Sequence, residues 1–373
     1  MWTNKQHIMS RLAKEHEVLY VDFTPRPALR AVRTLRGFRE PTVRKEGNVT
    51  VLGFYAPSIV HALRHGNPLR VFGQFDLRLR LLEQYLREHD MQNSIVWVYH
   101  PGYGAGVDRL PRKLLVYDCV DEYTAFPEFG KSKRWIAERE RALCQLADVV
   151  FCTAPALLEA KRRYNPEHTH LVHNVGDAEH FAKTRAPETP VAKDIASLAR
   201  PVIGFIGAVS DYKLNTDWLL QLAEARPDWS VAIVGPVGIA DPNTDLSKLE
   251  ELPNVHLLGH REYGVLPQYL KGFDVAVIPY RINDYTRSVF PIKFFEMMAS
   301  GKPVVISALP ALERYFSSAL VARDATEFIQ CCERALSDTG EARAERIALA
   351  ERNSWPARIR QLMEHIETRL AEQ

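Results

Sequence analysis

Short apolar runs alternate with longer amphipathic stretches along most of the 373-residue chain. Runs rich in Val, Ile, Phe and Tyr are typical of buried strands, and apolar residues at helical spacing lie between them. In the first half we predict strands over residues 17–23, 49–55, 95–99, 114–118, 148–153 and 170–173. In the second half we predict strands over residues 202–206, 230–234, 255–258, 274–279, 303–306 and 320–321. This alternation predicts an α/β protein with two doubly wound, Rossmann-like domains that face a central cleft.

A polar stretch with several prolines, residues 183–201, separates the two series of strands and has the composition of a linker. We therefore predict an N-terminal domain over 1–183 and a second domain over 184–353. A last helix over 354–373 is expected to pack back on the first domain. Within the second domain we predict helices over 216–225, 291–299 and 325–337.

The composition, 46% hydrophobic and 25% charged, is that of a globular protein. No apolar run reaches the roughly 18 to 20 residues that span a bilayer, and the first residues lack the apolar core of a secretory signal, so we expect a cytoplasmic protein. The five cysteines form no CxxC pair and have no His partners at metal spacing, which favours buried thiols.

The net charge of +2 is unevenly distributed. Residues 1–183 hold 27 Lys and Arg against 21 Asp and Glu, a net charge of +6, and the remainder holds 21 against 25, a net charge of −4. The basic half is expected to face an anionic partner such as phospholipid or a lipid diphosphate, although so modest an excess is also common on ordinary surfaces. We expect no nucleic-acid partner.

A basic amphipathic helix is predicted near the N-terminus, where arginines at roughly helical spacing flank an apolar stripe. Such a helix can lie on an anionic membrane surface, and a solvated basic face explains the pattern equally well. The arginines are Arg26, Arg30, Arg33 and Arg36.

A loop enters the predicted helix 291–299 with Pro291 in its first turn. The free N–H groups of such a turn favour an anion such as a diphosphate, and Lys293 would add a positive charge. Glu296, about one turn later, could accept hydrogen bonds from two ribose hydroxyls. An ordinary surface helix with a solvated Lys and Glu fits the spacing as well.

The segment Pro291-x-Lys293-x-x-Glu296-x-x-Ala299-x-Gly301-x-Pro303-Val304-Val305 resembles the donor-binding signature of the GT4 family of retaining GT-B glycosyltransferases, especially the teichuronic-acid and capsule branch. The resemblance implies a donor site for a nucleotide sugar such as a UDP- or GDP-sugar. It implies that Glu296 holds the ribose, and that the preceding loop, with Val289 and Phe290, holds phosphate and sugar through its N–H groups. The family's second Glu, which usually contacts the transferred sugar, is replaced by Ser288, and Arg287 is expected to supply phosphate charge.

A glycine-rich turn, residues 204–213, follows one predicted strand and precedes a helix, so that its backbone can approach a ligand closely. It is similar to the family's Gly-Arg-Leu-x-x-x-Lys turn. Gly207 and Lys213 fit that pattern, and Ala208 stands where the family has Arg. Lys213 is therefore expected to share the phosphate charge with Arg287 and Lys293.

Two further loops resemble family positions that line the nucleotide base, although each could be a plain βα loop. They are Gly235-Pro236, after the strand 230–234, and Tyr280, after the strand 274–279.

In the first half, the Tyr117-Asp118-Cys119-Val120-Asp121 segment ends a predicted strand and resembles the family's Tyr-Asp-x-x-Asp element. A carboxylate at this edge can align or deprotonate an acceptor hydroxyl, so we expect Asp118 or Asp121 in the acceptor region. Either could instead cap the next helix. His100, at the end of the preceding strand, is the other polar candidate. The family's first strand has no counterpart here, so we expect either an upstream start or a sheet with one strand fewer.

The sequence thus predicts a retaining glycosyltransferase for a saccharide or polyprenyl-diphosphate-linked acceptor, in surface-polysaccharide biosynthesis, with peripheral membrane contact. Retention rests on the resemblance. No DxD motif or His/Cys cluster indicates a metal, so protein cations are expected to stabilise the leaving diphosphate, and we expect no cofactor. The alternatives are a GT-B nucleotide-sugar epimerase or hydrolase and a non-catalytic sugar-nucleotide-binding protein.

Overall fold

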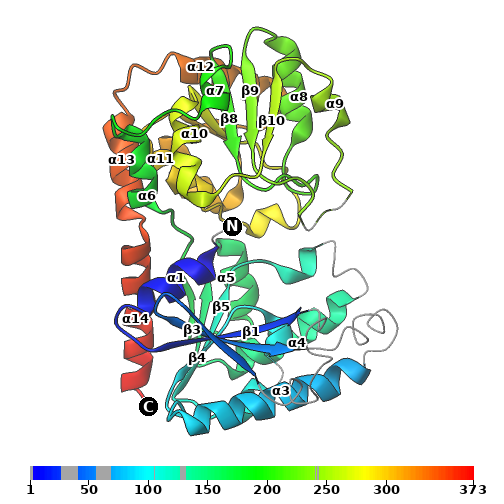
Figure 1. Ribbon diagram of the computed structural model, residues 1–373, viewed down its shortest axis with the longest axis vertical. Helices are drawn as coiled ribbons and strands as arrows, with labels where there is room; N and C mark the ends of the chain where they lie inside the picture. Colours follow the sequence, from blue (N-terminus) through cyan, green and yellow to red (C-terminus); the bar gives the residue numbers. More distant parts are fainter. Residues whose placement is uncertain are drawn as a thin grey trace. The chain divides into compact units, whose positions relative to one another are not determined.

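A computed structural model describes residues 3–26, 41–55, 69–104, 106–126, 132–239, 241 and 243–373 (Figure 1). The described residues form two compact units. The first unit comprises residues 119–138 and 151–364, and the second comprises residues 2–118, 139–150 and 365–373. The predicted basic helix with Arg30, Arg33 and Arg36 lies outside the described residues, and Arg26 ends a strand. The predicted domain boundaries stay a prediction.

A six-stranded parallel sheet forms the centre of the first unit (Figure 1). Its strand order, β10-β9-β8-β11-β12-β13, reverses beside β8, as in a doubly wound sheet. The strands are β8 (Val202–Ile206), β9 (Ser230–Val234), β10 (Val255–Gly259), β11 (Val275–Ile278), β12 (Val304–Ser307) and β13 (Leu320–Ala322). All six were predicted, and β8 and β9 have the predicted bounds, because buried parallel strands are continuous apolar runs.

Helices precede, connect and follow these strands. Those predicted over 216–225, 291–299, 325–337 and 354–373 are found within two residues of the predicted bounds, and the others had no predicted bounds. The helices are α6 (Ala178–Ala182), α7 (Lys193–Ala196), α8 (Thr216–Ala225), α9 (Ser247–Glu250), α10 (Leu266–Gly272), α11 (Lys293–Ala299), α12 (Ala325–Leu336), α13 (Arg343–Arg352) and α14 (Trp355–Ala371). The helix predicted over 291–299 begins two residues later, so that Pro291 precedes it and Ile292 is its N-cap. Because α11 has only seven residues, its dipole is smaller than that of the longer helix predicted over 291–299, and it attracts an anion less strongly.

A three-stranded sheet in the second unit joins β1 (Val18–Arg26), β3 (Val49–Tyr55) and β2 (Thr42–Glu46), in the order β1-β3-β2. Strand β2 pairs antiparallel with β3 and was not predicted. Its alternating polar pattern is that of an exposed edge strand, which has no apolar run to identify it.

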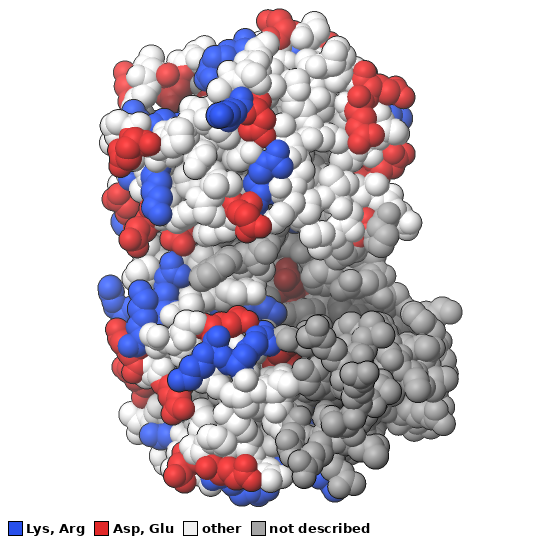
Figure 2. All heavy atoms as spheres, viewed as in Figure 1, with Lys and Arg blue, Asp and Glu red and all other residues white. Residues whose placement is uncertain are grey.

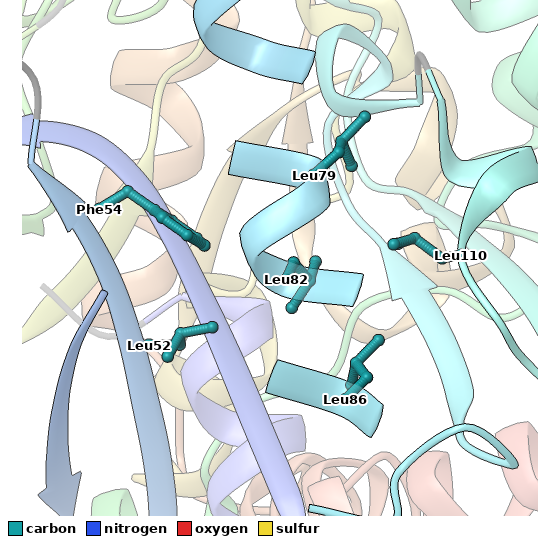
Figure 3. Close-up of a cluster of buried hydrophobic side chains, with 6 residues drawn as sticks. All are labelled: Leu52, Phe54, Leu79, Leu82, Leu86 and Leu110. Atoms are coloured by element: carbon teal, nitrogen blue, oxygen red, sulfur yellow. The ribbon is translucent and has the colours of Figure 1, made fainter. Parts of the chain in front are cut away.

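The core of this unit lies between β3 and α3 (Leu69–Glu88) (Figure 3). Leu52 and Phe54 come from β3 and pack with leucines of α3, namely Leu79, Leu82 and Leu86, and with Leu110. The three helix leucines recur at i, i+3 and i+7, the spacing of one helix face.

A four-stranded sheet runs in sequence order through β4 (Ile95–Val98), β5 (Leu114–Cys119), β6 (Val149–Cys152) and β7 (Thr169–Leu171). Every residue of β5 and β6 is buried, as the continuous apolar runs indicated. The accompanying helices are α1 (Asn4–Leu12), α4 (Lys133–Leu146) and α5 (Pro155–Arg162). The strands predicted for the first half are thus divided between two hydrogen-bonded sheets.

The surface and the cysteines bear on the remaining expectations. All five cysteines are free and buried, which confirms that prediction. Lys and Arg are interleaved with Asp and Glu over the described residues of the face in Figure 2. Within the described ranges, none of the helices is both long and apolar enough to cross a bilayer.

Candidate functional site

The turns after β8 and β9 cross at their glycines. The Gly207 amide donates to the Val234 carbonyl at 2.9 Å, and the Gly235 amide donates to the Gly259 carbonyl at 2.9 Å. Gly235 has a φ of +153°, and a Cβ there would lie 1.8 Å from the Gly207 carbonyl oxygen. The two turns therefore pack backbone against backbone, which only glycine allows at position 235. Ala208 and Pro236, next to them, are partly exposed.

Lys213 is held at the end of the turn after β8. Its amide donates to the Ser210 carbonyl at 3.0 Å, and its own carbonyl accepts from the Arg281 amide at 2.8 Å. The ammonium group lies 5.3 Å from the centre of the Tyr280 ring, in a cation–π arrangement. Burial lowers the pKa of Lys213, and the nearby Tyr212 and Asp121 act in the opposite direction.

Asp121 lies in the same unit as Lys213 and interacts with it electrostatically. Burial raises the pKa of Asp121 to about 7, although Lys213 and a hydrogen bond from Tyr285 both lower it. A carboxyl group with a pKa near neutrality can act as a general base at physiological pH.

Tyr280 interacts with both of the lysines that are expected to hold phosphate. The Lys213 ammonium group lies over the face of the Tyr280 ring. The charges of Lys293 and Glu296 both affect the pKa of the Tyr280 hydroxyl, in opposite directions. Burial raises the pKa of Tyr280 to about 12, so the phenol stays protonated. Tyr280 thus connects the turn after β8 to the start of α11.

Lys293 and Glu296 form an ion pair at the start of α11, with 3.0 Å between Nζ and Oε2. The Glu296 side chain is only 2% exposed and that of Lys293 15%. A carboxylate so deeply buried needs partners, and Lys293 supplies one. Lys293 was expected to meet a bound phosphate or solvent, and the structure gives it Glu296 as a partner. The remaining lone pairs of a carboxylate can accept hydrogen bonds from hydroxyl groups.

The loop before α11 is mostly buried. Ser288 and Val289 are buried, whereas Arg287 is exposed. The Phe290 ring stacks on His173 with 5.0 Å between ring centres, so its side chain belongs to an aromatic core and only its backbone could face a ligand. The Phe290 carbonyl already accepts from the Asn174 amide group at 2.9 Å.

Gly176 packs directly on α11. A Cβ at Gly176 would lie 2.6 Å from the Glu296 amide nitrogen and 2.9 Å from the Phe295 carbonyl carbon. Because both are backbone atoms, only glycine fits here. The Asn174-Val-Gly176-Asp177 segment thus fixes the position of Glu296, a role that its sequence pattern did not reveal.

The other two predicted residues, Asp118 and His100, belong to the second unit. Asp118 is the last residue but one of β5 and is fully buried. His100 accepts a hydrogen bond at Nδ1 from the Gly102 amide at 3.0 Å, so the neutral ring carries its proton on Nε2. Burial, with Lys5 nearby, lowers the pKa of His100. The roles predicted for both residues stay predictions.

Tyr285 is the residue near these groups that sequence reasoning missed. Its hydroxyl donates to Asp121 Oδ1 at 3.4 Å, and its ring packs on Tyr212 and Phe126. Nothing in the local spacing distinguishes it from an ordinary loop tyrosine, because its partners are distant in the sequence. Within the described ranges, His, Cys, Asp and Glu form no group of three or more that could hold a metal ion.

Comparison with known proteins gives this site a context. Residues 200–338 match the family model described as glycosyl transferases group 1. Over 319 residues the chain is 28% identical to TuaH of Bacillus subtilis (strain 168), a protein assigned to teichuronic acid biosynthesis as a glycosyltransferase, covering 81% of this chain and 79% of that protein.

Solved structures with low sequence identity share the fold. The sucrose-phosphate synthase (tll1590) from Thermosynechococcus elongatus superposes with a TM-score of 0.72 at 17% identity, over 99% of this chain and 93% of that one. An E. coli structure described as trehalose-6-phosphate bound with UDP-2-fluoro glucose gives a TM-score of 0.67 at 13% identity, over 94% and 98% of the two chains. The GT-B fold and the resemblance predicted from the sequence are confirmed.

Proposed function

Since the chain is a glycosyltransferase with a group 1 domain over residues 200–338, we propose that it transfers a sugar from a nucleoside-diphosphate sugar to a saccharide or lipid-linked acceptor with retention. The observation that carries the donor part is the buried Lys293–Glu296 pair beside Tyr280 and Lys213. These four residues place two cations and one hydroxyl-accepting carboxylate within the matched domain.

The donor would be held by complementary charges. The Lys213 and Lys293 ammonium groups suit the two phosphates, with Arg287 exposed nearby in the chain. The Glu296 carboxylate suits the ribose hydroxyls, which donate hydrogen bonds. Because α11 has only seven residues, we assign most of the phosphate binding to the side-chain cations rather than to a helix dipole. The Gly235-Pro236 turn would line the base.

Transfer breaks the bond between the anomeric carbon and the diphosphate oxygen, and forms a bond from that carbon to the acceptor oxygen. The lysines stabilise the negative charge that develops on the departing diphosphate. The acceptor hydroxyl must lose its proton, and Asp121, with a pKa of about 7, is the candidate to receive it. We propose that these steps need no metal ion, because the ammonium groups of Lys213 and Lys293 would neutralise the phosphates in its place.

The acceptor is proposed from the relative and from the charge distribution. TuaH is assigned to the biosynthesis of teichuronic acid, a role that supports surface-polysaccharide assembly here. The net charge of +6 in residues 1–183 suits a polyprenyl diphosphate or another anionic acceptor at a membrane surface.

Nucleotide release from a panel of UDP-, GDP- and TDP-sugars, with and without membrane lipid extract and with EDTA present, tests the proposal. We expect release that depends on both one donor and the extract, and that persists in EDTA. Release without acceptor would indicate an epimerase or hydrolase, and binding without turnover a non-catalytic protein. Glu296→Ala should abolish nucleotide binding, whereas Glu327→Ala, in the first turn of α12, should leave it unchanged.

A further inference from the structure

Three loops of the first unit meet at Tyr285. This residue lies in the loop after β11, immediately before the single turn Thr286–Ser288. Its hydroxyl reaches Asp121, which follows β5, and its ring contacts Tyr212, which precedes Lys213 in the turn after β8. A single side chain therefore touches the loop of the candidate base and the loop of a candidate phosphate ligand.

The loop of Tyr285 is fastened to the loop of Lys213 by hydrogen bonds. The Asn283 side-chain oxygen accepts from the Tyr285 amide at 3.0 Å, while its amide group donates to the Tyr212 carbonyl. Arg281 donates from Nε to the Asp211 carbonyl at 2.9 Å. These hydrogen bonds join the loops of Lys213 and Tyr285 and restrain the position of the Tyr285 ring.

Two aromatic rings also pack against the Tyr285 ring. Its centre lies 5.2 Å from that of Tyr212 at an interplanar angle of 75°, and 4.8 Å from that of Phe126 at 59°. Both distances lie within the range of favourable aromatic pairs. Phe126 follows Asp121 in the same loop, so its contact with the Tyr285 ring brings that loop close to the Tyr285 hydroxyl. The hydroxyl donates to Asp121 Oδ1 at 3.4 Å.

We propose that Tyr285 is a positioning residue that holds the Asp121 carboxyl group beside the Lys213 ammonium group, so that the acid and the cation act together on the transferred sugar. This inference rests on the function proposed above. With retention, the acceptor hydroxyl that Asp121 would deprotonate approaches the anomeric carbon on the face from which the diphosphate bound by Lys213 would leave, so the two groups are needed close together. Tyr285 sets the separation of these two groups without reacting itself.

The groups that face Asp121 define the expected pH dependence. Lys213 and Tyr285 both favour its charged form, and burial opposes them and dominates. Tyr285 in turn faces Asp121, Tyr212 and Tyr280, and burial raises its pKa well above its ordinary value, so it remains a donor. Removing the Tyr285 hydroxyl should therefore raise the pKa of Asp121 above about 7.

Tyr285→Phe keeps the ring packed against Tyr212 and Phe126 and removes only the hydroxyl group that donates to Asp121. We expect the acidic limb of the kcat profile to move up by roughly half to one pH unit, which lowers the rate about two- to fivefold at pH 7 and little above pH 9. Nucleotide affinity should be unchanged. Tyr269→Phe is the matched control, because it removes a tyrosine that donates to Asp194 at 3.0 Å on another part of the unit, and should leave the profile in place.

A purely structural role would lower kcat by the same factor at every pH, and that result would overturn the inference. Carbon-13 titration of the Asp121 carboxyl group, assigned with Asp121→Asn, gives a readout without turnover. We expect a higher midpoint in Tyr285→Phe than in the wild type, and coincident midpoints would refute the coupling whatever the reaction. Failure of the proposed function would instead show in the wild type, as an absence of transfer with every donor.

Discussion

The proposed contact between the Glu296 carboxylate and the ribose can be tested by replacing one carboxylate oxygen with an NH₂ group. Glu296→Gln keeps the size of a side chain that is only 2% exposed, and its remaining oxygen can still accept from Lys293 at about the present 3.0 Å. The new NH₂ group cannot accept a ribose hydroxyl. A hydrogen bond to a charged group contributes about 1.5–3 kcal/mol, so losing one should weaken nucleoside-diphosphate binding roughly 10- to 150-fold.

Calorimetric titration with nucleoside diphosphates that have or lack the 2′- or 3′-hydroxyl separates the ribose contact from other effects. The wild type should lose affinity for at least one deoxy form, whereas Glu296→Gln should bind it about as well as the parent nucleotide. Glu327→Gln, which changes a half-exposed acid in the first turn of α12, is the control. Equal affinity of Glu296→Gln and the wild type, or the same deoxy penalty in both, would refute the assignment of Glu296 to the ribose.

Three further changes probe how the site is held. Gly176→Ala places a Cβ 2.6 Å from the Glu296 amide nitrogen, so urea unfolding should show a loss of about 1–3 kcal/mol together with weaker nucleotide binding; a loss below about 0.5 kcal/mol would contradict the close packing. Arg358→Met removes the donor at 2.9 Å to the Asn174 side-chain oxygen and should cost about 1–3 kcal/mol in the same assay, and an unchanged unfolding midpoint would show that this bond is dispensable. Because burial raises the pKa of Asp121 to about 7, the folded state binds a proton that the unfolded state releases above about pH 4, and this carboxyl group costs stability as the pH rises through that window. Asp121→Asn should therefore raise the melting temperature relative to the wild type more at pH 8 than at pH 5, and a constant difference would contradict the raised pKa.

Much of the fold of the first unit could be predicted, because the strands of its six-stranded sheet are buried on both faces. Continuous apolar runs identified β8 and β9 with their observed bounds. Strand β2 was missed because an edge strand with a charged, half-exposed face has no such run. Helix α11 was predicted two residues too long at its start, since Pro291 is compatible both with a first helical turn and with the loop before it.

The candidate site was predictable where neighbouring residues in the sequence form it. Lys293 and Glu296 are three residues apart on one helix, and the structure pairs them. The contacts of Tyr285 with Asp121 and of Gly176 with Glu296 join residues more than 100 positions apart, and no local pattern encodes them. They follow from how loops at the ends of strands meet, which only the folded chain determines.

Under the proposed function, in which the turn after β9 lines the nucleotide base, the crossing of the turns after β8 and β9 limits how donor preference could be re-engineered. A transplanted turn that placed any side chain at position 235 would collide with the Gly207 carbonyl, so neither turn can be exchanged without its partner. Loop grafting would have to treat the two as one module. Point substitutions at Val237 and Ile239, which are 45% and 57% exposed, leave the backbone crossing intact and are the more tractable route to a different base.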